Sequence, residues 1–515
     1  MPDMTGATAR GAVGAIRVKQ PAGRWVLLAT VLGTSMAMLD GTVVNIALPS
    51  IGRSLGASLA GLQWTVTAYT LTLAGLILLG GSLGDRLGRR RVFLTGVIWF
   101  ALASALCGIA PNIGVLIGAR ALQGIGGALL APGSLAIIQA TFDPSDRPKA
   151  VGAWSGLGGV AGAVGPFLGG WIVQSIGWRW IFLINLPVAV AVAAVTTRHV
   201  PETSDPSANG RFDILGASLA ALALGGITYA LIEASGNGRI GGGVLAAAAA
   251  GLVAAAAFVL VERRRSRSPG RVPPMLPLGV FASRQFTAVN VVTFVIYGAL
   301  SAMLFLLVLE LQLVSGYSPL QAGVALLPFT VLTLLLSARA GALAQRIGPR
   351  WLMTAGALIC AVGMLLMTRI GANASYLADV LPGVFVFGLG LSMVVAPLTA
   401  TVLASAEVRH AGVASGVNNA VARAAGLLAI AGLPLAVGLT GPDYHSAALF
   451  EGGFRAAMVV CAAMLMVGAL LSATMIDNDV LKPAPAGPRA AEPECKTCLP
   501  LGAPPLEPGV SADTH

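Results

Sequence analysis

Two short segments, 260 positions apart in this 515-residue chain, decide how it is built. The first reads Gly81-Ser-Leu-Gly-Asp85-Arg86-Leu-Gly88-Arg89-Arg90, and the second reads Gly341-Ala-Leu-Ala-Gln345-Arg346-Ile-Gly348-Pro-Arg350. The same offset relates segments 152–156 and 412–416, which share the pattern Gly-x-x-Ser-Gly. Two matches at one offset indicate an internal repeat.

The composition around these segments is that of a membrane protein. Hydrophobic residues make up 56% of the chain and charged residues only 10%, and the mean hydropathy is +0.83. The apolar residues form blocks of about twenty, the length of a helix that crosses roughly 30 Å of hydrocarbon. We predict an all-α integral membrane protein with fourteen transmembrane spans: 25–48, 62–82, 92–110, 113–138, 150–174, 178–197, 212–232, 242–261, 287–309, 320–341, 351–370, 376–403, 411–440 and 454–476.

The net charge of +11 sets topology and does not indicate nucleic-acid binding. With both termini in the cytoplasm, the inside segments hold 24 Lys or Arg and the outside loops hold five. Because cytoplasmic loops carry the excess of positive charge, this bias predicts that both termini are cytoplasmic.

The repeat divides the chain into two parallel six-helix bundles. Parallel repeats related by an axis along the membrane normal place the substrate cavity at their interface. We therefore expect an organisation with a cytoplasmic tail, a first bundle, an inserted helix pair, a second bundle and a disordered cytoplasmic tail: 1–24, 25–200, 211–262, 286–476 and 477–515.

A pair of opposite charges falls inside the predicted spans. Asp40 lies in the first span and Arg120 in the fourth. Either charge costs about 2.5–3.5 kcal/mol in a bilayer, so each should face a partner or a cavity. A nearby Arg lowers a carboxyl pKa and desolvation raises it, which suits a proton-coupling site. The alternative is a static ion pair that fixes the two helices.

Segment 81–91 is expected to form the cytoplasmic turn between the second and third spans. We expect its small and charged residues to act as a conformational latch: Gly81, Asp85, Arg86, Gly88, Arg89 and Arg90. An ordinary basic loop is the alternative, but the echo at 341–350 argues against it.

The fifth span is rich in glycine and has an internal proline. Glycines three and four positions apart form a groove for close packing, and a proline favours a kink. The residues concerned are Gly158, Gly162, Gly165, Pro166, Gly169 and Gly170.

Several other polar residues are candidates for the cavity. They are Asn45, Gln123, Glu310, Asn418 and Asn419. Glu310 faces the cavity or caps the outer rim, Glu233 is interpreted as a rim residue, and Arg423 either pairs with a carboxylate or reaches the cytoplasmic interface. Cys495 and Cys498 form a lone Cys-x-x-Cys, which needs more ligands to bind a metal.

Together these segments resemble the fourteen-helix drug:proton antiporters of the major facilitator superfamily. The resemblance rests on the turn at 81–91, the Arg120 segment, Gly162–Gly170, the Asp40 segment, Trp178–Pro187 and Phe212–Gly216. It covers residues 25–476. Gln345, where the second turn lacks an acid, departs from it.

The resemblance implies how the parts work. Asp85 would latch the turn onto a helix of the other half in the outward-open state. The glycine motif of the fifth span is that of exporters, and Asp40 and Arg120 match residues held to take part in proton coupling.

The chain is therefore expected to export small, largely apolar compounds by proton antiport, as a monomer in the bacterial inner membrane. No phosphate loop, metal spacing or nucleophile–base set is present, so we expect no cofactor, no enzyme activity and an ion gradient as energy source. The alternatives are a proton-coupled importer or facilitator, or a membrane sensor or lipid-handling protein on the same fold.

Overall fold

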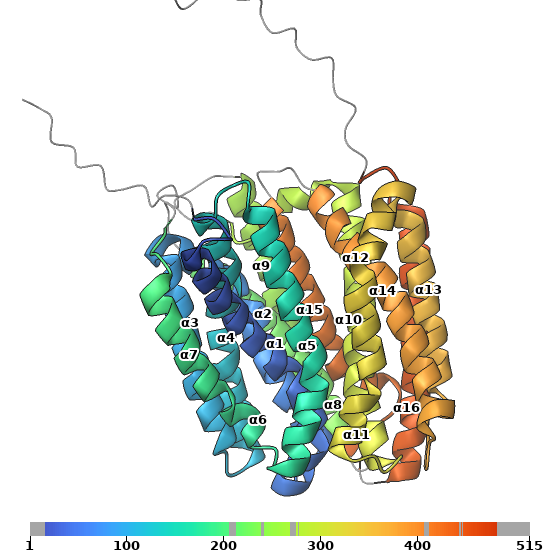
Figure 1. Ribbon diagram of the computed structural model, residues 1–515. Helices are drawn as coiled ribbons and strands as arrows, with labels where there is room; N and C mark the ends of the chain where they lie inside the picture. Colours follow the sequence, from blue (N-terminus) through green and yellow to red (C-terminus); the bar gives the residue numbers. More distant parts are fainter. Residues whose placement is uncertain are drawn as a thin grey trace, which may run out of the picture.

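The described part of the chain folds into fourteen long apolar helices, some of them broken (Figure 1). The computed structural model describes residues 16–204, 213–237, 241–267, 274–276, 278–405, 411–441, 444 and 446–481. In these residues the only strand-like pairing is an isolated bridge between Ile16 and Phe142. The prediction of an all-α fold with fourteen spans is confirmed.

The helices before the insertion form the first bundle. They are α1 (Pro21–Leu55), α2 (Leu59–Leu87), α3 (Arg89–Gly108), α4 (Ile113–Thr141), α5 (Arg147–Ser175), α6 (Trp180–Leu183) and α7 (Asn185–His199). Helix α4 packs against α2 and α3, and α1 packs against α5 and α7.

The second bundle has the same number of spans. Its elements are η1 (Leu278–Ala282), α10 (Arg284–Leu313), α11 (Pro319–Ala325), α12 (Leu327–Ile347), α13 (Pro349–Met367), the π-helix η2 (Tyr376–Val380), α14 (Leu381–Ala404), α15 (Ala411–Ala436) and α16 (Ala447–Met475). Helix α14 packs against α12 and α13, while α10 packs against α15 and α16.

The inserted helices lie beside the junction of the two bundles. Helix α8 (Ile214–Asn237) packs on α9 (Gly242–Arg267) and also on α2 and α15. Asp213, just before α8, accepts hydrogen bonds from Gly216 N and Met275 N and pairs with Arg265. The insertion is thereby tied to the linker that leads into the second bundle.

Most helices are longer than the hydrophobic pattern predicted. Helix α1 starts at Pro21 and ends at Leu55, where the sequence predicted 25–48, and α9 continues to Arg267. Backbone hydrogen bonding continues into polar residues beyond the hydrocarbon, and a hydropathy pattern does not detect this. Part of the predicted N-terminal tail is therefore helical.

The predicted C-terminal tail begins with anchored residues. Asp477 N donates to Gln285, and Asn478 Nδ2 donates to Ile347 O. Cys495, Cys498 and the rest of that tail lie outside the described residues, as do residues 1–15.

Two spans are broken, and a third begins irregularly. The sixth breaks between α6 and α7 at Ile184, the tenth between α11 and α12 at Leu326, and the twelfth opens with the π-helix η2. Pro319 and Gly323 lie in the short α11, next to α5.

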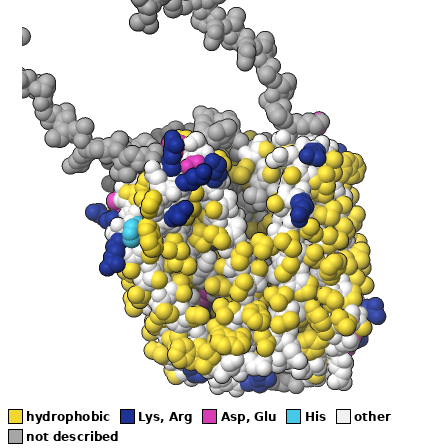
Figure 2. Space-filling model, in the orientation of Figure 1, with side chains coloured by type: hydrophobic (Ala, Val, Ile, Leu, Met, Phe, Trp, Pro, Cys, Tyr) yellow, Lys and Arg dark blue, Asp and Glu magenta, His cyan; other side chains and the backbone are white. Residues whose placement is uncertain are grey.

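The surface fits a bilayer. Hydrophobic side chains cover the middle of the visible face, and Lys and Arg gather toward its two ends (Figure 2). Helix α1 begins and α16 ends at the same end of the molecule, the top of Figure 1. We call this the terminal end, and the opposite one the distal end.

Candidate functional site

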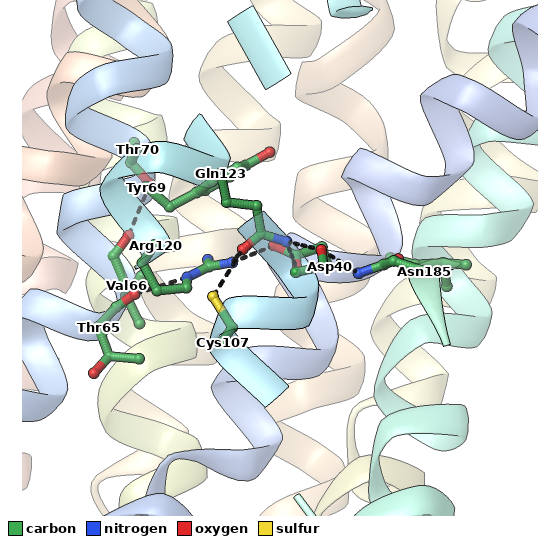
Figure 3. Close-up of polar contacts among 12 residues, drawn as sticks. Asp40, Thr65, Val66, Tyr69, Thr70, Cys107, Arg120, Gln123 and Asn185 are labelled. Carbon is green, nitrogen blue, oxygen red and sulfur yellow. Dashed lines mark hydrogen bonds and ion pairs between the residues drawn. The ribbon is translucent and has the colours of Figure 1, made fainter. Parts of the chain in front are cut away.

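A buried ion pair joins α1 to α4 in the middle of the first bundle. Arg120 Nη1 lies 2.5 Å from Asp40 Oδ2, and the two side chains are 1% and 0% exposed (Figure 3). The sequence placed both charges inside apolar spans, where each needs a partner or a cavity, and in the structure the two side chains form an ion pair. Whether the pair couples protons or only fixes the helices depends on its other contacts.

Neighbouring polar groups satisfy the pair. Gln123 Nε2 donates to Asp40 Oδ1 at 2.7 Å and to Ser104 Oγ at 2.7 Å, while Gln123 Oε1 accepts from Arg120 Nη1 at 2.6 Å. Arg120 Nε donates to Thr65 O at 3.0 Å. Asn185 Nδ2, from the start of α7, reaches Ser104 Oγ. The network therefore connects five helices of one bundle.

An aromatic ring lies against the guanidinium of the pair. The Tyr69 ring centroid lies 4.4 Å from Arg120 Cζ, a cation–π distance. Arg120 lines a cavity that Tyr69 also lines, whereas Asp40 is not among the residues facing it. A solute in this cavity would therefore contact Arg120 directly and could affect Asp40 only through the ion pair.

Among the cavities that described residues form between the bundles, two adjoin each other and share Thr42, Asn45 and Leu304. One, of about 530 Å³, is enclosed by α1, α5, α10, α11–α12 and α14 and has no charged residue in its lining. We call it the apolar lobe. The other, of about 490 Å³, is enclosed by α1, α2, α4, α10 and α15 and is lined by Arg120 and Arg423. We call it the cationic lobe.

The glycines of α5 pack against both neighbouring helices. A Cβ on Gly165 would lie 2.0 Å from Thr42 Oγ1, and one on Gly169 would lie 3.1 Å from Val43 Cα. A Cβ on Gly170 would lie 2.5 Å from Pro319 O, in the other bundle. Gly162 and Pro166 line the apolar lobe, and Gly158 has only Thr34 near it.

The contacts between bundles gather toward the distal end. Gln312 Nε2 donates to Ile46 O at 2.9 Å, and Leu320 N donates to Gln174. A Cβ on Gly323 would lie 2.2 Å from Pro166 O. Backbones in such close contact seal this end against solute in the conformation described.

The turn at 81–91 is held within its own bundle. Arg89 Nε and Nη2 both donate to Asp85 Oδ1, at 2.9 and 2.8 Å. Gly88 adopts φ of 107°, a conformation that L side chains rarely adopt. Gly81 and Arg86 lie in the last turns of α2. In the described structure Asp85 makes no hydrogen bond to the second bundle.

A carboxylate that the sequence analysis missed covers this turn. Glu202, after α7, accepts a hydrogen bond from Arg90 N and lies 3.8 and 3.6 Å from the side chains of Arg90 and Arg91. A Cβ on Gly88 would lie 2.6 Å from it. The sequence feature that could have pointed to Glu202 is its position as an acid just after the sixth span. Its partner Arg90 lies 112 residues away in the sequence.

The repeated turn has an equivalent cover. Gly348 adopts φ of 90°, and a Cβ there would lie 2.0 Å from Asn478 Oδ1, just after the last span. Each repeat thus closes its turn with a polar side chain that follows its final helix.

The match to a known family covers most of the chain. A family model described as the Major Facilitator Superfamily matches residues 30–430. The chain belongs to this superfamily. It is thus a multi-pass membrane transporter and not an enzyme, as the motifs predicted.

Its relatives are bacterial resistance proteins. The chain is 36% identical over 477 residues to the puromycin resistance protein of Streptomyces alboniger, covering 88% of this chain and 91% of that one. It is 34% identical over 450 residues to the methylenomycin A resistance protein of Bacillus subtilis, covering 87% and 93%. A solved POT family peptide transporter matches with a TM-score of 0.66 over 90% and 99% of the chains. At 17% identity, this match shows the fold alone.

Within the superfamily fold, the other predicted polar residues take different places. Asn45 and Asn419 line the cavities. Asn418 Nδ2 instead donates to Asn290 and Thr293 in the second bundle, and Gln123 is fully buried in the ion-pair network. Neither of these two side chains lines a lobe.

The remaining predicted charges are also placed. Glu310 is fully buried near the distal end, and neither carboxylate oxygen has a hydrogen-bond partner in the described structure. It lines neither lobe. Glu233 lies near the distal end of α8. Arg423 lines the cationic lobe and forms no ion pair with a carboxylate among the described residues.

Proposed function

We propose that the chain is a proton-driven exporter of small, largely apolar compounds, of the drug or antibiotic type. The observation that carries this proposal is the buried Asp40–Arg120 pair directly beside a cavity between the bundles. The names of the relatives, which are resistance proteins for puromycin and methylenomycin A, support the class of cargo.

The cavity dimensions suit such cargo. Two adjoining lobes of about 530 and 490 Å³ fall in the usual range for sites that hold drug-sized molecules. The apolar lobe offers side chains such as Leu334 and Phe329, which bind by contact area rather than by directed hydrogen bonds.

Asp40 is the proposed proton carrier. Protonation of Oδ2 would remove the charge that holds Arg120 Nη1, whose other acceptor, Gln123 Oε1, is already 2.6 Å away. The guanidinium would then turn toward the cationic lobe that it lines. Proton binding on one side of the membrane and release on the other would thus accompany the exchange of solute.

Alternating access would proceed by opening the distal contacts. In the proposed cycle, α5 separates from α11 and α1 from α10, while the terminal end closes around the turns at 81–91 and 341–350. The bundles proposed as moving bodies are residues 25–200 and 286–476, with 211–262 as an inserted pair between cytoplasmic tails 1–24 and 477–515.

We place the terminal end in the cytoplasm of a bacterial cell, in the inner membrane. The excess of Lys and Arg at that end supports this orientation, since cytoplasmic loops carry such an excess. The protein would act as a monomer, because one chain supplies both bundles and both lobes.

The test uses the purified full chain in proteoliposomes with an imposed pH gradient and a fluorescent aromatic probe, anthracene-9-methanol. An antiporter moves the probe against the proton flux, and collapse of the gradient with an ionophore stops the movement. Movement in the same direction as protons would instead establish the importer, and no gradient-dependent movement of any aromatic solute would exclude both.

A further inference from the structure

Arg423 is a cation inside the cavity that has no protein partner in the described structure. Its Nε is buried without a hydrogen-bond acceptor, and it forms no ion pair among the described residues. The other cation of the lobe, Arg120, is neutralised by Asp40. No Asp or Glu lines either lobe. A desolvated charge of this kind is costly unless something pairs with it.

One face of α15 presents this cation to the lobe. The residues of α15 that line the lobe recur at helical spacing, so they form a single stripe: Asn419, Ala422, Arg423, Gly426 and Ile430. Asn419 lies one turn before Arg423, so an amide and a guanidinium point into the same space. Together they can donate several hydrogen bonds to one acceptor group.

The helices packed beside α15 add groups of the same character. Tyr297 and Ser301 line the lobe from α10, and Tyr69 and Thr70 line it from α2. The described structure gives no hydrogen bond to the Tyr297 hydroxyl. These hydroxyls and the guanidinium form a donor-rich surface with aromatic rings beside it, which suits a planar acidic group.

The apolar lobe supplies the rest of the site. It adjoins the cationic lobe at Thr42, Asn45 and Leu304 and has no charged residue in its lining. A solute with an apolar ring system and an acidic group can fill both lobes at once. A solute with a positive charge would place that charge against Arg423.

We propose that Arg423 selects solutes that carry an anionic group, a carboxylate or a phenolate, with the apolar body of the solute in the apolar lobe. This inference rests on the proposed export function and names its substrate class. Arg is suited to this role, because its planar guanidinium binds carboxylates through two parallel hydrogen bonds.

The test compares three probes with the same ring system and different charges: anthracene-9-carboxylate, anthracene-9-methanol and 9-(aminomethyl)anthracene. Binding to the purified full chain is followed by the change in probe fluorescence, and export is measured in proteoliposomes. We expect the carboxylate to bind at least about tenfold more tightly than the alcohol, the effect of a charge-assisted hydrogen bond, and the ammonium to bind most weakly.

The Arg423→Gln variant should lose this preference, with carboxylate affinity reduced about tenfold or more and alcohol affinity nearly unchanged. Arg423→Lys should keep part of it, because it retains the charge without the fork. Arg339→Gln is the matched control, since Arg339 is an exposed cation of α12 that lines neither lobe. It should behave as the unmodified protein does.

Three outcomes would overturn the inference. They are equal binding of the three probes by the unmodified chain, tighter binding of the ammonium, and an equal loss of all three probes in a folded Arg423→Gln or Arg423→Lys protein. Binding is measured without a gradient, so failure of proton-driven export would count against the proposed function and leave the charge preference to be judged separately.

Discussion

At the scale of single residues, Asp40 has one observed role and one proposed role. It pairs with the buried Arg120, and we propose that it also binds and releases a proton. All the donors around Asp40 come from its own bundle, through Arg120 and Gln123. If Asp40 carries the proton as proposed, its protonation would break the ion pair and free Arg120 to move. An amide at position 40 retains the shape but has no proton to exchange.

Asp40→Asn should abolish proton-driven export while the protein still folds and inserts. Exchange of solute down its own gradient should persist, because the lobes are unchanged. The measurement is probe efflux from proteoliposomes with and without an imposed pH gradient, and the unmodified protein is the reference. Undiminished proton-driven export by the variant would remove Asp40 from the coupling role and direct attention to the buried Glu310.

Arg120→Ala should be more damaging than Arg120→Lys. The alanine leaves a buried carboxylate without its cation, a change that typically costs about 3–5 kcal/mol. Lysine keeps the charge, but its single ammonium nitrogen cannot occupy the separate positions of Nε, which donates to Thr65 O, and Nη1, which donates to Asp40 and Gln123. Thermal unfolding in detergent measures the difference. Equal melting temperatures for the two variants would contradict the assignment of a stabilising charge pair.

At the scale of elements, the glycines of α5 set how closely helices approach. Gly165 and Gly169 face α1, while Gly170 faces α11 across the junction of the bundles. The sequence pattern predicted close packing, but it gave no indication that the motif contacts both bundles. The contact with the second bundle is visible only once α11 is placed. This short helix exists because the tenth span breaks at Leu326.

Gly169→Leu should separate α5 from α1 and reduce export strongly, with leakage of protons as a second effect. The reason is steric, since even a Cβ at 169 would lie 2.8 Å from Val43 Cγ1. Gly152→Leu is the control on the same helix, because a Cβ there has no neighbour within 4 Å and position 152 lines neither lobe. Proton permeability and probe export are both measured in proteoliposomes. Equal behaviour of the two variants would contradict the packing role.

At the scale of the whole molecule, the hydrogen bonds observed between the two bundles in the described residues lie near the distal end. Gln312 to Ile46 O and the α5–α11 approach hold the distal end, whereas Asp85 is bonded to Arg89 in its own bundle. The resemblance to the antiporters implies that Asp85 contacts the other bundle when the distal end is open. The present arrangement is compatible with that hypothesis, since the distal end is sealed.

Asp85→Asn should leave folding intact and slow turnover, because the terminal end would close less reliably. We expect export to fall several-fold while probe binding stays unchanged, which separates this effect from loss of the cavity. Asp143→Asn is a useful control. Asp143 lies in the next terminal-end turn, and in the described structure its carboxylate accepts hydrogen bonds only from the neighbouring Ser145. A normal export rate for Asp85→Asn would exclude the latch.

The sequence was a good guide to the spans and a partial one to the site. Because a charge in an apolar span is costly, the sequence predicted that Asp40 and Arg120 each face a partner or a cavity. The internal repeat indicated the two halves. Gln123 looked like a cavity residue because helical position alone does not show which side chain fills a polar network. Glu202 was missed because only the folded chain brings it over Gly88.

The apolar lobe also bears on how such proteins diverge. On the α12 side its wall combines apolar side chains such as Leu334 with hydroxyls that bond only to their own helix, as those of Thr330 and Thr333 do. Replacing one of them alters the shape offered to a solute and leaves the Asp40 network, which belongs to other helices, intact. If the proposed function holds, single substitutions in the lobe could change the solute that is accepted without disturbing the proposed coupling site, so related transporters could diverge in cargo while they keep the same coupling residues.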